Sequence, residues 1–141
     1  MGSLKLTLLI VAIGLTMSCN AQKTILYGAN RTYSNQKVDA YACDDFISGT
    51  KTLIGSTVAD SAGNFRIELD IHKTCRVTLD LGRARGILYA DTAMIYNIVL
   101  PDYEPKSKGD IMNPFFEPED FLVGIKNPDR FNINMYIDLF D

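Results

Sequence analysis

A strict alternation of apolar and polar residues between positions 65 and 72 constrains the fold of this chain more than any other feature. The apolar positions are Phe65, Ile67, Leu69 and Ile71, and the polar positions are Arg66, Glu68, Asp70 and His72. A period of two places successive side chains on opposite faces of an extended strand. The segment therefore predicts a β-strand with one face on a core and the other in water.

Similar patterns predict seven short strands, near residues 23–29, 36–43, 52–59, 64–71, 74–81, 85–90 and 94–100. Turn residues join them, as in the stretch from Asp60 to Asn64, where Gly63 can adopt a positive φ and Asp60 can cap the turn. No helical period separates the strands. We therefore expect an all-β, antiparallel sandwich of two sheets rather than a parallel sheet.

The five prolines all lie at or beyond Pro101, and this distribution predicts a change in the character of the chain. Proline cannot donate to a sheet ladder, so the proline-free part suits continuous strands and the later part suits loops and edges. We expect a sandwich domain over 22–103, followed by a proline-rich linker or extension over 104–141 with a candidate edge strand at 121–125. This extension is also consistent with the start of a further domain downstream.

The last residues predict a short helix, because apolar side chains recur there at helical spacing: Ile133, Tyr136, Ile137 and Phe140. A helix of two turns is marginal alone. Its apolar face must either fold back on the sandwich or meet a partner outside the present chain, and we favour the second.

Residues 1–21 have the composition of a secretory signal segment. An uncharged run from Leu6 to Met17 is too short for a bilayer-spanning helix, which needs about 20 residues. We favour cleavage after Ala21, which would leave Gln22 as the first residue; acylation of Cys19 and, last, a retained membrane anchor are the alternatives. These readings predict an exported protein that is periplasmic, secreted or associated with an outer membrane, and that touches a membrane only through its signal peptide or a lipid anchor.

The charge distribution argues against a nucleic-acid partner, and the strand positions of the cysteines argue against a disulfide. Residues 22–100 hold 9 basic and 8 acidic side chains, whereas 101–141 hold 4 basic and 9 acidic ones, with no basic cluster that would favour nucleic acid. Strand parity places Cys43 outward and Cys75 inward, so we expect two thiols and no disulfide.

The segment from Val58 to Ile67 carries a family resemblance. Asp60, Gly63, Phe65 and Ile67 match the signature Thr-Asp-x-x-Gly-x-Phe-x-Ile, with Ala59 at the threonine position. Over residues 23–100 the chain resembles the carboxypeptidase regulatory-like, transthyretin-like domains of exported bacterial proteins. This resemblance implies a seven-stranded, immunoglobulin-like sandwich without catalytic residues.

A second likeness involves residues 86–141. The stretches 86–90, 96–101 and 113–116 are similar to the front of long, uncharacterised exported proteins of Gram-negative bacteria. In those proteins the chain continues well beyond this region. The likeness favours a chain that is the first part of a longer protein.

Signals for catalysis are weak. His72 is the single histidine and falls on the polar face at a strand end, which favours a solvated side chain over a general base. The chain has neither a Gly-x-Ser-x-Gly nor a Cys-x-x-Cys motif. Asp39, Asp44 and Asp45 gather near one strand end, but their spacing matches no calcium loop. We therefore expect no enzymatic activity, no cofactor and no metal site.

The preferred function is a non-catalytic module with a structural or interaction role, which contacts a protein partner or a downstream domain. One alternative is a glycan-binding module, because seven tyrosines are present and Tyr41 has outward parity beside Asp39, a candidate acceptor for sugar hydroxyls. Another alternative is an accessory domain of an enzyme whose catalytic part lies downstream.

Overall fold

The computed structural model describes residues 23–45, 47–126 and 133–137. The predicted cleavage site at Ala21 and Gln22 and the candidate lipidation site Cys19 lie outside the described residues. The strands are β1 (Thr24–Ala29), β2 (Lys37–Asp45), β3 (Thr50–Val58), β4 (Asn64–Leu69), β5 (Cys75–Leu81), β6 (Ala84–Ala90), β7 (Ile95–Val99), β8 (Glu119–Leu122) and β9 (Gly124–Ile125). The helices are η1 (Arg31–Tyr33), α2 (Lys108–Met112) and α3 (Ile133–Ile137).

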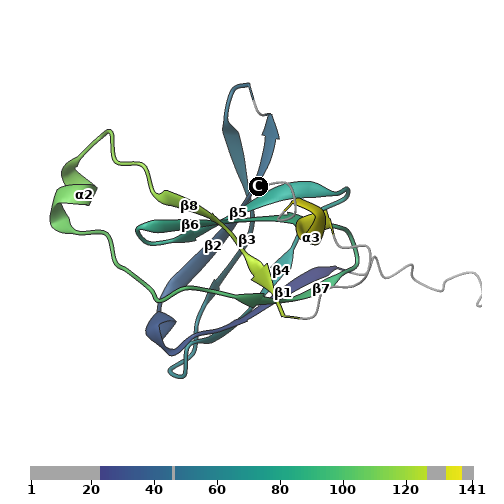
Figure 1. Cartoon of the computed structure of the whole chain (residues 1–141), viewed down its shortest axis with the longest axis horizontal. Coiled ribbons are helices and arrows are strands. Elements are labelled where there is room, and N and C mark those ends of the chain that lie inside the picture. Colours follow the sequence, from purple (N-terminus) through teal and green to yellow (C-terminus); the bar gives the residue numbers. More distant parts are fainter. Residues whose placement is uncertain (1–22, 46, 127–132, 138–141) are drawn as a thin grey trace, which may run out of the picture.

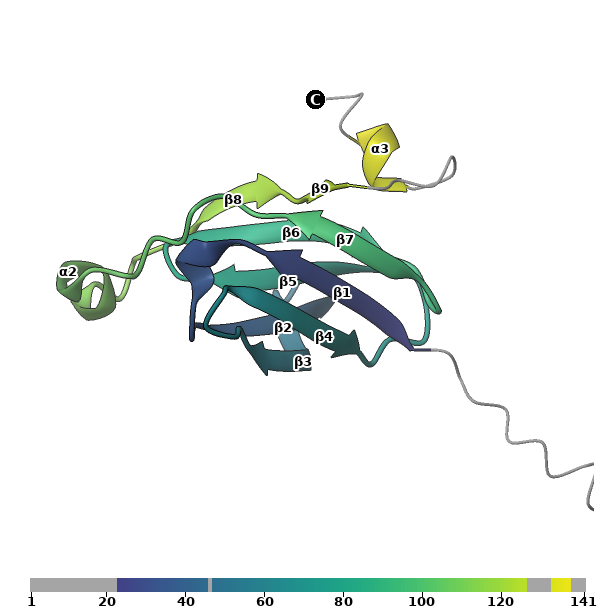
Figure 2. The ribbon, with the colours of Figure 1, turned by 90° about the horizontal axis from the view of Figure 1, so that it is seen from below.

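The strands form two sheets that lie over each other as two layers (Figures 1 and 2). One sheet has the order β4-β1-β7-β9 and the other has the order β3-β2-β5-β6-β8. Both sheets are mixed, because β1 pairs in parallel with β7 and β6 pairs in parallel with β8. The expectation of purely antiparallel sheets is therefore corrected. Alternation predicts which face a residue occupies, but it carries no information on which strands become neighbours or on their relative direction.

The described part of the chain has nine strands rather than the expected seven. The seven expected segments correspond to β1 through β7, with ends that differ by at most two residues. The two additional strands come from residues 119–125, where the candidate edge strand at 121–125 is present as two short strands within the stretch expected to be a linker or extension. Instead, β8 pairs with β6 and β9 pairs with β7, so this stretch adds a strand to each sheet.

The core lies between the sheets and is built from the inward positions of both. Leu26 and Ile67 of one sheet and Leu79 and Leu88 of the other are at most 1% exposed. They belong to a single apolar cluster that also includes Val123. Burial of apolar surface in such a cluster is the main favourable term in folding.

The two sheets are linked to each other at both lateral sides of the two-layer body. On one side Val123 joins β8 to β9, so the chain passes directly from one sheet to the other. On the opposite side the backbone N–H of Asp70 donates to the carbonyl of Ile54 at 3.0 Å and links the end of β4 to β3. Edge strands with unpaired backbone groups are sites of unwanted pairing, and these links shorten the open edges.

The predicted C-terminal helix is present as α3, and it covers a free part of the β6 edge. The Asn134 side chain accepts a hydrogen bond from the backbone N–H of Tyr89 and donates one to its carbonyl, both at 2.7 Å. The Asn134 side chain therefore satisfies both backbone groups of Tyr89, as a neighbouring strand would do. Ile133 and Tyr136 remain 39% and 49% exposed, and Phe140 lies outside the described residues.

The two cysteines of the body lie on opposite faces of the same sheet. Ala42 pairs with Val77, so Cys75 shares the inner face with Val77 and packs against the core, whereas Cys43 has the opposite parity. The two thiols form no disulfide.

Candidate functional site

The turn between β3 and β4 is held together by the Asp60 carboxylate. Its Oδ1 accepts hydrogen bonds from the backbone N–H groups of Ala62, at 2.8 Å, and Asn64, at 2.9 Å. Hydrogen bonds from the backbone and the side chain of Asn64 lower the pKa of Asp60. Desolvation acts in the opposite direction but does not outweigh them. The carboxylate is thus committed to shaping the turn.

Gly63 is required in this turn for two reasons. Its φ is +82°, a left-handed conformation that side chains disfavour. A Cβ atom there would lie 2.1 Å from the carbonyl oxygen of Asn30. The turn therefore sits directly against the loop that follows β1.

Phe65 follows the turn and points into the core, where it is 5% exposed. It is paired with Gly28 of β1, and a Cβ atom at Gly28 would lie 2.2 Å from the Phe65 ring. The ring thus covers the bare backbone of the facing glycine, an arrangement that compensates for glycine in a strand. Asp60, Gly63 and Phe65 form a structural unit. Gly28, which the sequence reasoning did not single out, completes it.

The predicted ligand-contact pair, Tyr41 and Asp39, lies on the outer face of the five-stranded sheet. Asp39 accepts hydrogen bonds from Ser56 Oγ at 2.5 Å and Lys37 Nζ at 2.9 Å. Partial burial alone would raise the pKa of Asp39, but these two hydrogen bonds outweigh it and the pKa is lowered. Tyr41 is half-buried between Leu53 and Thr78 on the neighbouring strands. Both residues are therefore already engaged within the sheet.

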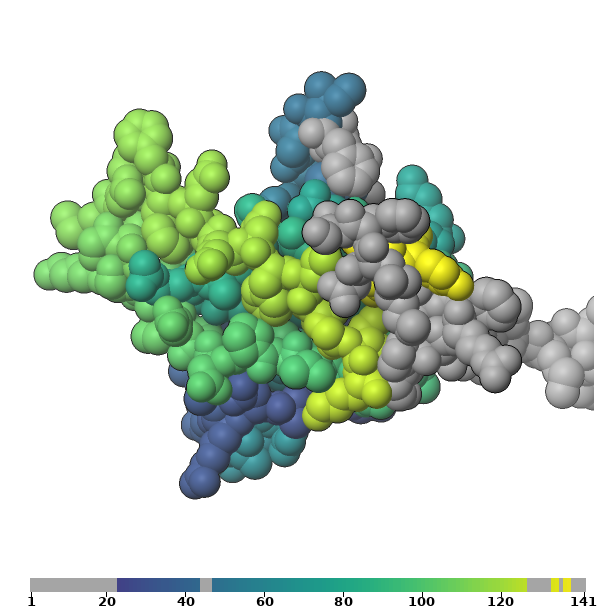
Figure 3. All heavy atoms as spheres, viewed as in Figure 1, coloured from purple at the N-terminus to yellow at the C-terminus, as the bar shows by residue number. Residues whose placement is uncertain are grey.

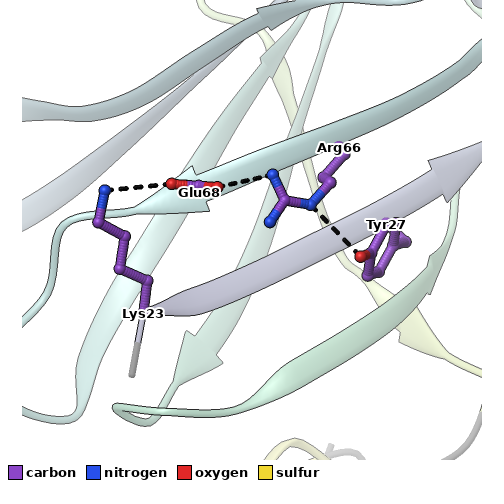
Figure 4. Close-up of polar contacts among 4 residues, drawn as sticks. All are labelled: Lys23, Tyr27, Arg66 and Glu68. Carbon is purple, nitrogen blue, oxygen red and sulfur yellow. Dashed lines mark hydrogen bonds and ion pairs between the residues drawn. The ribbon is translucent and has the colours of Figure 1, made fainter. Parts of the chain in front are cut away.

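A chain of polar contacts crosses the outer face of the other sheet (Figure 4). Lys23 Nζ lies 3.1 Å from Glu68, Glu68 lies 2.6 Å from Arg66, and Arg66 Nε donates to the Tyr27 hydroxyl at 3.3 Å. These charges are well exposed, so they contribute little to stability. Their effect is to hold the partly exposed Tyr27 ring in place.

Residues 101–118, which we name the protruding segment, project from the two-layer body. The chain leaves the two-layer body after β7, carries α2 away from it and returns at β8 (Figures 1 and 3). Asn30 Nδ2 donates to the carbonyls of Leu100, at 3.2 Å, and Pro101, at 3.1 Å. The Thr32 hydroxyl accepts from the backbone N–H of Tyr103 at 2.8 Å. The loop after β1 thus anchors the start of the segment.

Arg83 holds the two ends of the protruding segment together. Its backbone N–H donates to the carbonyl of Glu104 at 2.9 Å, and its own carbonyl accepts from the N–H of Glu119 at 3.0 Å. Its side chain reaches into the segment and lies 3.2 Å from Asp110. One residue between β5 and β6 therefore closes the neck of the protrusion.

Helix α2 has a complete capping box. The Ser107 hydroxyl accepts from the backbone N–H of Asp110, and the Asp110 carboxylate accepts from the N–H of Ser107. These hydrogen bonds lower the pKa of Asp110, and the charge of Arg83 adds to the effect. The segment was expected to be a loop here, although the spacing of Ser107 and Asp110 is a recognisable helix-start signal.

Three large apolar side chains on the protruding segment face the solvent, and we name them the apolar tip. Ile111 is 72% exposed, Met112 is 75% exposed and Phe115 is 87% exposed. The backbone of Phe115 is held by Asn113, whose side-chain oxygen accepts a hydrogen bond from the N–H of Phe115 at 3.0 Å. Clustered apolar residues on a surface commonly mark an interaction site.

A cleft of about 600 Å³ lies where the protruding segment meets the body, and we name it the acidic cleft. Its apolar walls include Phe116 and Phe121. Its charged residues are Arg83, Asp102, Glu104, Glu117 and Glu119. The apolar tip and the acidic cleft adjoin each other, because Phe115 belongs to the tip and Phe116 to the cleft.

A buried hydroxyl lies near the base of the protruding segment. Tyr33 is 1% exposed, and its ring meets that of Tyr103 edge-on, with centroids 5.1 Å apart. Burial raises the pKa of Tyr33 to about 12, and the charges of Tyr103 and Asp102 add to the effect. Within the described residues the Tyr33 hydroxyl has no hydrogen-bond partner.

The single histidine and the acidic groups of the described residues do not gather into a metal-binding cluster. His72 Nε2 lies 3.8 Å from Asp70 Oδ1, but the two side chains are 91% and 82% exposed. No group of three or more His, Cys, Asp or Glu residues is placed to hold a metal ion in this part of the chain. Among the helices described, none has the length and apolarity that a membrane crossing requires.

Comparisons with known proteins gave no match. No protein-family model, no curated protein and no solved structure matches the chain.

Proposed function

We propose that this chain is a non-catalytic interaction module of an exported protein, and that the protruding segment is its contact surface for a protein partner. The observation that carries the proposal is the exposure of Ile111, Met112 and Phe115, at 72%, 75% and 87%. Side chains of this size are usually at least partly buried in a free domain. Their burial against a partner would supply the apolar anchors that dominate protein interfaces.

The shape of the protruding segment supports this proposal. Its neck is closed by Arg83, its helix is capped by Ser107 and Asp110, and its start is tied to Asn30. A surface that is already ordered loses little conformational entropy on binding. The polar groups of the segment thus maintain its geometry, and its apolar groups are left available for contact.

The position of the segment also fits an exported chain. Strand β1 begins at one end of the body and α2 lies at the opposite end (Figure 2). The expected cleavage site at Ala21 or lipid anchor at Cys19 comes shortly before β1 in the sequence. In a protein tethered through Cys19, the apolar tip would then lie at the end of the body opposite to the start of β1. The resemblance of residues 58–67 to transthyretin-like sandwich domains of exported proteins is consistent with such a role.

Photo-crosslinking in the source cells tests the proposal. A photoreactive phenylalanine analogue replaces Phe115 in the full chain, and the matched control carries the analogue at Val58, which is 62% exposed on the edge strand β3. We expect a discrete protein adduct from position 115 and none of the same mass from position 58. Equal adducts at both positions, or none at position 115, would refute the proposal.

A second candidate function, glycan binding, is favoured by the outer face of the four-stranded sheet. A hollow of about 370 Å³ lies beside the Tyr27 ring and is also lined by Asn64, Asn97 and Lys126. An exposed aromatic ring beside amide and ammonium groups suits a sugar ring with several hydroxyls. In a glycan array, Tyr27→Ala should abolish the signal and Tyr41→Ala should leave it unchanged; an array without any signal removes this candidate.

A further inference from the structure

We infer that the partner of the apolar tip is a basic, amphipathic polypeptide segment. Its apolar side chains would cover Ile111, Met112 and Phe115, and its lysine or arginine side chains would enter the acidic cleft. This inference rests on the proposed function and adds the chemistry of the partner to it.

Continuity of the two surfaces is the first step. Phe115 belongs to the apolar tip, and the next residue, Phe116, forms a wall of the acidic cleft. A chain that lies across Phe115 therefore meets the cleft within one or two of its own residues, given about 3.3 Å per residue in an extended strand. The partner must satisfy an apolar surface and an acidic one side by side.

The charge at the cleft selects a cationic partner. Glu104, Glu117 and Glu119 line the cleft, and within the described residues no cation lies in ion-pair contact with any of them. Arg83, the cation that lines the cleft, is directed to Asp110 at 3.2 Å. The excess of carboxylates creates a negative potential, which attracts positive groups and raises their rate of association.

A lysine of the chain itself illustrates the chemistry of the cleft wall. Lys106 Nζ lies 6.0 Å from the centroid of the Phe116 ring and 3.8 Å from Asp80 Oδ1. An ammonium group is thus held between an aromatic face and a carboxylate at this border of the cleft. A lysine or arginine of the partner would find a similar combination in Phe121 with Glu119, which line the same cleft.

The same charges argue against a lipid surface as the occupant. Residues 101–141 hold 4 basic and 9 acidic side chains. Segments that insert into membranes usually surround their apolar residues with lysine and arginine, because bilayer surfaces are commonly anionic. Here the two lysines near the tip, Lys106 and Lys108, are outnumbered by carboxylates.

Fluorescence anisotropy on the full chain tests the inference. The probes are a dye-labelled synthetic peptide of alternating lysine and leucine, and its counterpart with glutamate in place of lysine. We expect the lysine peptide to bind at least about tenfold more tightly than the glutamate peptide, because like charges at an interface are strongly unfavourable. Added salt should weaken the binding, because it screens these charges.

Variants assign that binding to the surface. Two variants should each lower the affinity for the lysine peptide by about tenfold. One is the double variant Glu117→Gln with Glu119→Gln, and the other is Phe115→Ser. The matched control is Glu68→Gln with Asp70→Asn, which removes two exposed carboxylates from the opposite part of the body and should leave the affinity unchanged. Circular dichroism melts establish that each variant is folded.

Several outcomes would overturn the inference. If both peptides bind equally and Phe115→Ser abolishes the binding of both, the tip is still the contact surface but its partner is not basic. Failure of the lysine peptide to bind, or an equal loss in the control variant, would eliminate the basic partner too. Binding to phosphatidylglycerol vesicles that depends on Phe115, without peptide binding, would identify a lipid surface instead. The crosslinking experiment at position 115 tests the proposed function separately.

Discussion

The turn between β3 and β4 and the protruding segment use similar polar chemistry for opposite purposes. In the turn, Asp60 accepts backbone hydrogen bonds from Ala62 and Asn64, and the following Phe65 is buried in the core. In the protruding segment, Asp110 accepts the backbone N–H of Ser107, yet the following apolar side chains face the solvent. A capped backbone therefore does not reveal whether its apolar neighbours serve folding or contact; only their burial distinguishes the two.

The two regions meet at a pair of tyrosines. Tyr33 of η1 precedes β2 near the turn, and Tyr103 belongs to the base of the protruding segment. The backbone of Asn35, two residues after Tyr33, donates to the carbonyl of Asp60 at 3.3 Å. The loop between β1 and β2 is thus in contact with both regions, and substitutions there can separate their contributions.

The largest expected difference is in the free energy of unfolding when a phenylalanine is removed from each of the two regions. Phe65→Ala should lower the free energy of unfolding by about 3–5 kcal/mol, because it removes a buried ring and leaves a cavity over Gly28. Phe115→Ala should change it by less than about 0.5 kcal/mol, because that ring is 87% exposed. Urea unfolding of both variants measures the contrast. Similar losses for the two would show that the protruding segment also supports the core.

A smaller effect, of opposite sign, is expected at the tyrosine pair. Tyr33→Phe should raise the free energy of unfolding by about 1 kcal/mol, because it removes a buried hydroxyl that has no partner in the described structure. Tyr27→Phe, whose hydroxyl accepts from Arg66 at the surface, serves as the control and should change little. A loss of stability in Tyr33→Phe would reveal a hydrogen bond to that hydroxyl.

The same variant has a signature in alkaline solution. Since the pKa of Tyr33 is raised to about 12 in the folded state, the folded protein retains a proton that the unfolded chain loses near its ordinary pKa of 10.0. The contribution of this proton to the free energy of unfolding is fully present below pH 10 and is lost as the pH rises towards 12. Wild-type stability should therefore fall in this range more steeply than that of Tyr33→Phe.

The smallest effect is expected at Asp60 and appears on the acid side. Because the pKa of Asp60 is lowered from 3.8 by the hydrogen bonds of Asn64, its stabilisation is present above that value and is lost as the pH falls through the folded pKa. Asp60→Asn should therefore be less stable than the wild type at neutral pH, and the difference should shrink below pH 3.8. Denaturant midpoints across this range give the measurement. A difference that does not vary with pH would assign the role of Asp60 to shape rather than charge.

Much of the body could be predicted from local pattern. The alternation of Phe65, Ile67 and Leu69 with charged residues predicts the buried face of β4, and these three are 5%, 1% and 1% exposed. Parity also predicts the inward direction of Cys75. Such predictions succeed because the side-chain direction of a strand depends only on position along it.

The remaining features depend on distant residues. The parallel pairing of Ile25 with Ile95 joins segments about seventy positions apart, and no local pattern encodes it. Strands β8 and β9 are short, and the sequence pattern predicts one candidate edge strand at 121–125 rather than an added strand for each sheet. The tip was missed for another reason: Ile111, Met112 and Phe115 have ordinary apolar character in sequence, and only the structure shows them exposed.

The closed neck at Arg83 gives the molecule a modular construction. Because Glu104 and Glu119 both bond to the backbone of Arg83, the residues between them begin and end at one place on the body. Insertions or deletions there change the entropy of closing a loop, and that cost grows by only about 0.6 kcal/mol per doubling of the loop length. The protruding segment can therefore change in length or sequence while both sheets stay intact.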